Sequence, residues 1–194
     1  MDELSRTRQT YGKIASQYGK DHSDIEEVAK YADFFVSNIE GNILDIGCGP
    51  GRDSRYFEEN GLFSIGIDIT PEFIAMAKEN SPGSEFSQMD ARYLAFPEGR
   101  FDGVWACASL LHLPREDMPM AIGEAYRALK DGGLLFVSLK EGSGERYVGE
   151  RYFSYYSENE ITGILEDAGF TIVSVEKEKK KDDWISVFAK KKQR

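Results

Sequence analysis

The feature of this sequence that most constrains its fold is the run ILDIGCGPGRDS at residues 43–54. A short apolar segment carrying Asp45 leads directly into Gly47, Gly49 and Gly51. Glycines in such a place let the backbone turn tightly and come close to a ligand without side chains in the way. At the end of a central parallel strand, this loop would line the crevice where open α/β sheets bind ligands. The run therefore predicts a site for a nucleotide-type cofactor.

Short apolar segments alternate with helical ones from residue 41 onward. Candidate strands lie at 43–46, 63–68, 85–88, 101–107 and 134–139, and candidate helices at about 52–60, 71–80 and 114–130. Such alternation is typical of a mostly parallel sheet covered on both faces. The last two candidate strands, 170–175 and 184–189, are joined by a loop too short for a crossover helix, so we expect them to pair antiparallel. The predicted fold is a Rossmann-like, doubly wound α/β structure, with a mostly parallel seven-stranded sheet, an antiparallel last strand and N-terminal helices.

The chain shows no linker or internal repeat that would divide it. We expect one domain over residues 1–194, with a helical cap at 1–40 and a cofactor-binding α/β core at 41–194. Ser157 and Glu160 have the spacing of a capping box at the start of a further helix. We expect the charged run at 176–183 to be a solvated hairpin tip, and the lysines of residues 190–194 to be a frayed tail.

Composition limits the partners and the compartment. The 24 basic and 34 acidic side chains leave a net charge of −10, which opposes binding to nucleic acid or to an anionic membrane. The longest apolar stretch, Gly103 to Leu113, is far shorter than a membrane-spanning helix, and residues 1–10 contain no apolar signal region. Two cysteines, Cys48 and Cys107, suffice for neither a disulfide framework nor a metal cluster. We therefore expect a cytoplasmic protein with no metal.

Spacing and charge around the glycines narrow the choice of cofactor. The dinucleotide fingerprint needs a third glycine at position 52, where this chain has Arg52, and the Gly-Lys-Ser/Thr of a phosphate-binding loop is absent. Asp45 would repel a pyrophosphate but suits a ligand that carries an ammonium group.

At these residues the sequence resembles the class I S-adenosylmethionine-dependent methyltransferases, from about Tyr11 to Lys190. Residues 45–51, DIGCGPG, match the first motif of that family, whose backbone holds the methionine and ribose parts of the cofactor. Asp68, in GIDIT, matches the acid that accepts from both ribose hydroxyls, a task suited to the two oxygens of a carboxylate. Asp90 and Ala91 resemble the turn that binds adenine.

Further segments extend the resemblance. FDGVWACASLLHL at 101–113 resembles the motif of the fourth strand, and LKDGG at 129–133 the turn before the fifth, although Asp131 replaces the usual proline. Tyr11 and Tyr18 match a helix that folds over the cofactor. The resemblance implies a cofactor-binding set of Tyr11, Tyr18, Asp45, Gly47, Cys48, Gly49, Gly51, Arg52, Asp68, Ile69, Asp90, Ala91 and Cys107.

Each assignment has a plainer alternative. Asp68 could be only an acid at a helix start, and Asp90 could only cap a turn. Tyr11 and Tyr18 could be core residues. Arg52 opposes the dipole of its helix, so it needs a partner, either the cofactor carboxylate or a nearby side chain.

The acceptor side of the site is less defined. His112 lies just beyond the fourth strand and could act as a general base, or be a histidine positioned by the fold. Residues around the loop 140–156 could form a polar acceptor pocket, namely Lys140, Glu141, Arg151, Tyr155 and Tyr156.

The resemblance implies methyl transfer from S-adenosylmethionine to a small-molecule acceptor, by a monomer or a homodimer. The chain lacks the Asn/Asp-Pro-Pro-aromatic tetrad of nucleic-acid amino-methyltransferases, with Cys107-Ala108-Ser109-Leu110 in its place. Two alternatives remain: a non-catalytic cofactor-binding regulatory subunit, and a nicotinamide-dependent oxidoreductase.

Overall fold

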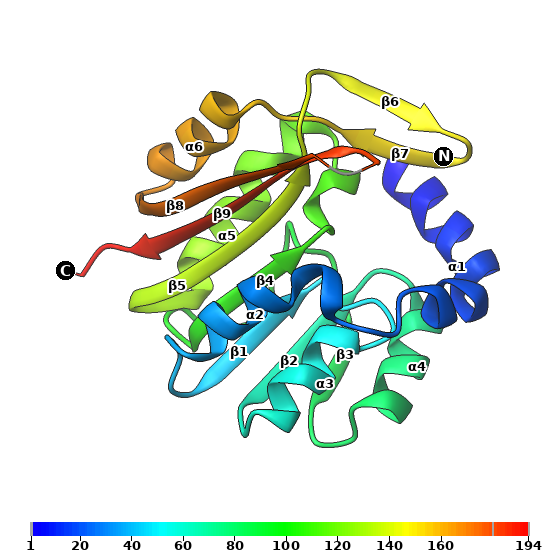
Figure 1. Cartoon of the computed structure of the whole chain (residues 1–194), viewed down its shortest axis with the longest axis horizontal. Helices are drawn as coiled ribbons and strands as arrows, with labels where there is room; N and C mark the ends of the chain where they lie inside the picture. Colours follow the sequence, from blue (N-terminus) through cyan, green and yellow to red (C-terminus); the bar gives the residue numbers. More distant parts are fainter. Residues whose placement is uncertain (1, 180, 194) are drawn as a thin grey trace.

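The computed structural model describes residues 2–179 and 181–193. Its main strands are β1 (Asn42–Ile46), β2 (Phe63–Asp68), β3 (Glu85–Gln88), β4 (Phe101–Cys107), β5 (Leu129–Lys140), β8 (Phe170–Lys179) and β9 (Asp183–Lys191). They form one seven-stranded sheet in the order β3-β2-β1-β4-β5-β9-β8 (Figure 1). β9 runs antiparallel to both of its neighbours, β5 and β8, and the other neighbouring pairs of this sheet are parallel. The predicted fold class is therefore confirmed.

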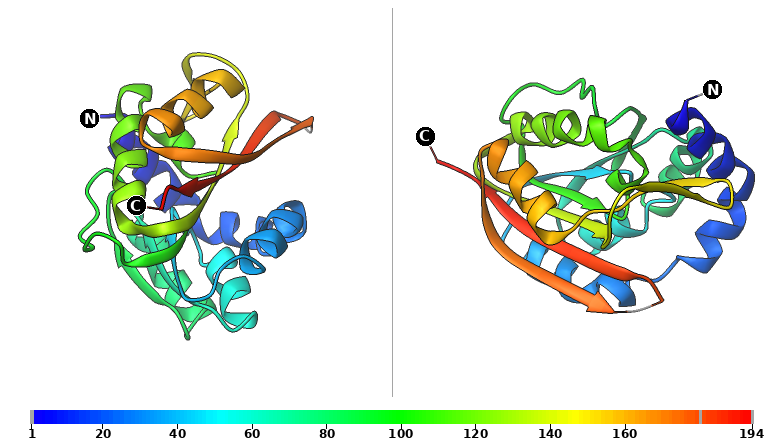
Figure 2. Two further views of the ribbon diagram at one scale, coloured as in Figure 1. Left: turned by 90° about the vertical axis from the view of Figure 1, so that its left-hand side faces the viewer. Right: turned by 90° about the horizontal axis from the view of Figure 1, so that it is seen from above.

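Helices cover both faces of the sheet and the end where the glycine loop of residues 47–51 lies (Figure 2). They are α1 (Glu3–Asp21), α2 (Ala29–Val36), α3 (Arg52–Glu59), α4 (Pro71–Asn80), α5 (Met118–Ala128) and α6 (Glu158–Asp167), with single 3-10 turns η1 (Glu26–Val28), η2 (Leu110–His112) and η3 (Arg115–Asp117). The capping box at the start of α6 is confirmed, since Ser157 and Glu160 each accept from the other's backbone N–H.

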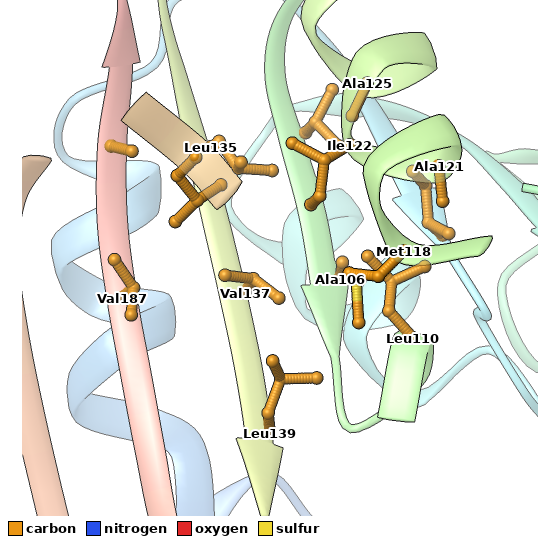
Figure 3. Close-up of a cluster of buried hydrophobic side chains, with 14 of the residues drawn as sticks. Ala106, Leu110, Met118, Ala121, Ile122, Ala125, Leu135, Val137, Leu139 and Val187 are labelled. Atoms are coloured by element: carbon orange, nitrogen blue, oxygen red, sulfur yellow. The ribbon is translucent and has the colours of Figure 1, made fainter. Parts of the chain in front are cut away.

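One face of the sheet packs against α5 and α6. Along β4 and β5, successive side chains alternate between the two faces, so Ala106, Leu135 and Val137 point toward α5. Figure 3 shows Met118, Ile122 and their neighbours on α5 meeting these strand residues in an apolar layer.

Aromatic side chains fill the opposite face, beneath α2 and α3. Trp105 stacks on Phe136, with ring centroids 4.0 Å apart, and Phe35 and Phe57 pack against the same indole. Aromatic pairs of this kind add to the free energy gained from burying their area. Because α2 belongs to this layer, part of residues 1–40 is built into the core and does not only cap it.

The structure differs from the sequence-based expectations at several boundaries. The helix expected at 114–130 begins with η3 and becomes α-helical only at Met118, and β5 begins five residues early, at Leu129. Strand β8 extends through Lys179 into the charged run, of which Lys180 lies outside the described residues. The expectation of a frayed lysine tail is wrong for Lys191, which is 3% exposed and whose Nζ donates to the carbonyls of Tyr126 and Leu129.

A two-stranded hairpin of β6 (Glu145–Val148) and β7 (Arg151–Ser154) was not expected in the loop 140–156. It lies beside α1, far from that helix in sequence, as Figure 1 shows. Of the helices in the described part of the chain, none is long and apolar enough to cross a membrane.

Candidate active site

The loop after β1 approaches a cavity through glycine backbone. The amides of Gly47 and Cys48 both donate to the carbonyl of Ile67, at 2.7 and 3.0 Å, which ties the loop to the end of β2. Gly49 has a φ of +51°, and a Cβ built on it would meet no atom within 4 Å. A side chain there would project into open space that the glycine keeps available for a ligand.

The cavity has a volume of about 370 Å³ and is lined by residues from the ends of β1, β2, β4 and β5, from α1 and from the loops between them. It lies at the carboxyl ends of the parallel strands, where open α/β sheets bind ligands. Most of the predicted site residues line it: Tyr11, Tyr18, Gly47, Cys48, Gly49, Arg52, Asp68, Ile69, Asp90, Ala91, Cys107 and His112.

Asp45 and Gly51 are not among the lining residues. Asp45 is 1% exposed and accepts from the Ser54 hydroxyl at 2.7 Å, beneath the loop. Burial, together with the charge of Asp53, raises the pKa of Asp45 well above its ordinary value. Gly51 contacts α4, and a Cβ on it would come within 2.9 Å of the Ala77 backbone. Both residues therefore shape the loop from behind.

Asp68 joins the loop to the next helix. Its carboxylate accepts from the Gly49 amide at 3.1 Å and from the Thr70 amide at 2.8 Å. Burial raises the pKa of Asp68, although these amide donors act to lower it. Asp68 thus accepts from the backbone at the start of α4 and also lines the cavity.

Asp90 already has protein partners. Its carboxylate accepts from the Arg92 amide at 2.9 Å and pairs with the Arg92 guanidinium at 2.6 Å, which also reaches Asp117 at 2.7 Å. Asp90 therefore caps its own turn, and it still lines the cavity beside Ala91.

Arg52 has the side-chain partner that its position requires. Its Nε lies 2.6 Å from Asp53 Oδ1, and the indole N–H of Trp105 donates to the other Asp53 oxygen at 2.7 Å. The importance of Asp53 was not foreseen, because an acid in the first turn of a helix is usually read only as a favourable charge.

His112 uses both of its ring nitrogens. Nδ1 lies 2.7 Å from the Tyr152 carbonyl, which can only accept, so Nδ1 carries the proton. Nε2 then accepts from the Tyr11 hydroxyl at 2.9 Å. Burial lowers the pKa of His112 to about 4, so the ring is neutral at pH 7. Its role as a general base stays a prediction.

The tyrosines of α1 form one wall of the cavity. The rings of Tyr11 and Tyr18 meet edge to face with centroids 5.4 Å apart, and both contact Phe73 of α4. They are packed residues and cavity residues at the same time.

The expected acceptor pocket is only partly assembled. Lys140 and Arg151 line the cavity, whereas Tyr155 and Tyr156 are buried in the main core. Glu141 is not a lining residue and pairs with Lys177 at 2.8 Å. Phe153 and Trp184 also line the cavity, and no local pattern in the sequence singles them out.

Comparisons with known proteins agree with this geometry. Residues 44–137 match the family described as "Methyltransferase domain". The malonyl-[acyl-carrier protein] O-methyltransferase of Enterobacter lignolyticus is 27% identical over 129 residues, which are 64% of this chain and 49% of that protein. The 2-methyl-6-phytyl-1,4-hydroquinone methyltransferase of Synechocystis is 37% identical over 100 residues, which are 50% of this chain and 31% of that protein.

Among solved structures, magnesium protoporphyrin IX methyltransferase from Synechocystis, with bound S-adenosylhomocysteine, aligns with a TM-score of 0.82 at 20% identity, over 98% of this chain and all of the other. The 1,6-didemethyltoxoflavin-N1-methyltransferase of Burkholderia thailandensis aligns with a TM-score of 0.81 at 21% identity, over 97% of this chain and 88% of the other. These likenesses show the fold. The chain spans about half or less of the length of the relatives that it matches in sequence.

Proposed function

Because the chain belongs to the class I S-adenosylmethionine-dependent methyltransferases, we propose that its cavity binds S-adenosylmethionine and that the protein transfers the methyl group to a small-molecule acceptor. The observation that carries the proposal is the Asp68 carboxylate bound to the Gly49 amide, in the wall of the cavity beside the glycine loop. This places an acceptor of hydrogen bonds next to backbone that a ligand can approach closely.

The hydrogen-bonding groups of the cavity fit S-adenosylmethionine. Asp68 retains lone pairs for two vicinal hydroxyls after accepting from two amides, since a carboxylate has about four acceptor positions. The Ala91 amide would donate to adenine, and Asp90 would accept from it in exchange for one of its bonds to Arg92. Open space in front of Gly49 would take the ribose and methionine parts. Asp45 is buried behind the glycine loop, so it would act on the ammonium group of the cofactor only through that loop.

S-adenosylmethionine supplies an already activated methyl group, so the protein has chiefly to align the reactants. Orientation of this kind can lower a barrier by about 7 to 11 kcal/mol. The packed rings of Tyr11 and Tyr18 exclude water from one side of the cavity. His112 holds Tyr11 in place through its Nε2, which favours a positioning role over that of a base.

The proposal extends to the domain organisation, the compartment and the partners of the protein. We propose a single cytoplasmic domain, monomeric or homodimeric, that acts on neither nucleic acid nor membrane. The net charge of −10 supports the last point. The malonyl and hydroquinone methyltransferases among the relatives act, by their names, on acceptors other than nucleic acid.

Calorimetry with S-adenosylhomocysteine tests the cofactor site. We expect binding in the wild type, and in Asp131→Ala as a control at an exposed position near the start of β5, and loss of binding in Asp68→Ala and Gly49→Val. Valine at Gly49 would both fill the open space and strain a backbone with a φ of +51°. Unchanged affinity in both folded site variants would refute the assignment.

Two measurements address the alternatives. Competition by NAD would point to a nicotinamide oxidoreductase, which Arg52 at the third glycine position already disfavours. Cofactor binding without methyl transfer to any acceptor of a broad panel would point to a regulatory subunit. Retained turnover in His112→Ala would remove the general base from the mechanism.

A further inference from the structure

We propose that the methyl acceptor is a small organic carboxylate, that Arg151 receives this carboxylate, and that one of its oxygens takes the methyl group. The inference rests on the proposed function and adds the class of acceptor and the atom that is methylated.

Arg151 stands at the start of β7 and lines the cavity. Its guanidinium carbon lies 5.4 Å from the centroid of the Phe153 ring and 6.0 Å from that of Tyr11. Among residues 2–179 and 181–193, no carboxylate forms an ion pair with it. A guanidinium presents two parallel N–H donors that match the two oxygens of a carboxylate.

The other cations of the cavity wall are already paired. Arg52 is bound to Asp53 at 2.6 Å, and Lys140 to Asp182 at 2.7 Å. Asp68 faces the glycine loop, where two amides hold it. Arg151 is therefore the cation whose charge is available to a ligand within the described part of the chain, in a protein whose net charge is −10.

An apolar surface lies beside this charge. The Phe153 side chain is buried against the core and reaches the cavity, with Lys140 Nζ 4.3 Å from its ring centroid. The ring centroid of Trp184 lies 5.9 Å from the same Lys140 Nζ. A carboxylate on an apolar or aromatic body matches an arginine set beside such rings.

Among the described residues, the groups that line the cavity offer no free base, which favours the carboxylate as the reacting group. Carboxylates of the cavity wall already accept from amides or cations, namely Asp68, Asp90, Glu178 and Asp182. His112 has both ring nitrogens engaged, and its pKa is lowered to about 4 by burial. Burial raises the pKa of the Tyr11 hydroxyl and of the Cys107 thiol, so neither is ionised at neutral pH. An alcohol, phenol or protonated amine would need a base to become nucleophilic, whereas a carboxylic acid, with a pKa near 4, is already ionised.

The reaction needs no proton transfer. A lone pair of the carboxylate oxygen forms a bond to the methyl carbon while the carbon–sulfur bond breaks, and its electron pair stays on sulfur. The negative charge of the acceptor and the positive charge of the sulfonium disappear together. The products are a methyl ester and S-adenosylhomocysteine.

The test uses the full chain and methyl-labelled S-adenosylmethionine. Acceptors are acetate, malonate, octanoate, benzoate and phenylacetate, each beside its primary amide, and the low-molecular-weight fraction of a bacterial extract. Mild alkali releases the label from a methyl ester as volatile methanol, but leaves N-, S- and C-methyl groups intact. We expect alkali-labile label from carboxylates or extract, and none from the amides.

Variants separate acceptor binding from cofactor binding. Arg151→Gln should raise the KM for the acceptor about 10- to 100-fold, as expected for a lost charge-assisted hydrogen-bond pair, and Arg151→Lys should recover part of it. The matched control is Arg146→Gln on the same hairpin, where the guanidinium stacks on Tyr155 outside the cavity wall. Affinity for S-adenosylhomocysteine should change much less than the acceptor KM in all three variants, because Arg151 borders Tyr11 but is not itself one of the predicted cofactor residues.

Alkali-stable label, or an Arg151→Gln enzyme with unchanged acceptor KM, would overturn this inference and leave the proposed function intact. Cofactor binding with no labelled product from the panel or the extract would also overturn it. Failure to bind S-adenosylhomocysteine in the wild type would instead refute the proposed function itself.

Discussion

Replacing Asp53 by alanine should destabilise the protein by about 3 to 5 kcal/mol. The Asp53 carboxylate accepts from the indole of Trp105, which is fully buried, and pairs with Arg52 at 2.6 Å. Leaving a buried N–H without its acceptor costs about 1 to 3 kcal/mol. The unpaired Arg52 adds about 2 kcal/mol, less than the full cost of a buried charge, because its side chain is 19% exposed and can reach water.

Urea unfolding, followed by circular dichroism, measures the change. Asp53→Asn keeps one oxygen for the indole and should lose roughly half as much free energy of unfolding. Asp53→Ala made in a Trp105→Phe background should cost about 1 to 2 kcal/mol less than in the wild type, since the indole donor is already gone. A cost below about 1 kcal/mol, or strict additivity of the two substitutions, would refute this account of the triad.

Three further predictions concern stability. The folded-state pKa of His112 is lowered to about 4 from 6.5, so its neutral form contributes stability above pH 6.5 that is lost as the pH falls toward 4. His112→Gln should remove about 3 kcal/mol of this pH dependence of unfolding, and an unaltered profile would contradict the burial argument. Lys191→Ala should cost about 1 to 3 kcal/mol in urea unfolding because the lysine donates to two carbonyls at 2.9 and 2.8 Å, whereas the exposed Lys190→Ala should be near neutral. Equal costs would count against a structural role for the C-terminal lysine. Gly51→Ala should lower the thermal midpoint more than Gly99→Ala, because both have positive φ but only the first would press a Cβ against α4, and the reverse order would contradict the contact.

Sequence patterns predicted most strands of the sheet, because a strand is recognisable both by its apolar run and by the residues that interrupt that run. β2, β3 and β4 have the predicted bounds, and a charged residue marks one boundary of each: Asp68 ends β2, Glu85 begins β3 and Arg100 precedes β4. Because successive side chains of a strand point to opposite faces, a continuous apolar run places apolar residues on both faces of the sheet. Helices must then cover both faces. The positions of the glycine loop and Asp68 were predictable for the same reason, since the loop directly follows β1 and Asp68 is the last residue of β2.

Side-chain partnerships were much less predictable. The β6–β7 hairpin carries a local signal, Gly149 at the first position of a two-residue turn, with a φ of +62°. β6 is exposed along its whole length, so no alternation of buried residues accompanies this turn. The hydrogen bond between Tyr11 and His112 joins positions 101 residues apart, and no local pattern specifies such a contact. The burial of Asp45 behind the loop depends on rotamer and register, which a motif does not encode.

The position of α1 has a consequence for the order of folding. The hydrogen-bond partners of this helix, His112 and Glu150, lie 101 and 140 residues further along the chain. The wall that Tyr11 and Tyr18 provide can therefore be completed only when most of the chain has been synthesised. Closing so long a loop is slow, and an element held by a few distant contacts detaches before the sheet unfolds. Mild denaturant should consequently abolish ligand capture while the β-sheet signal in circular dichroism persists.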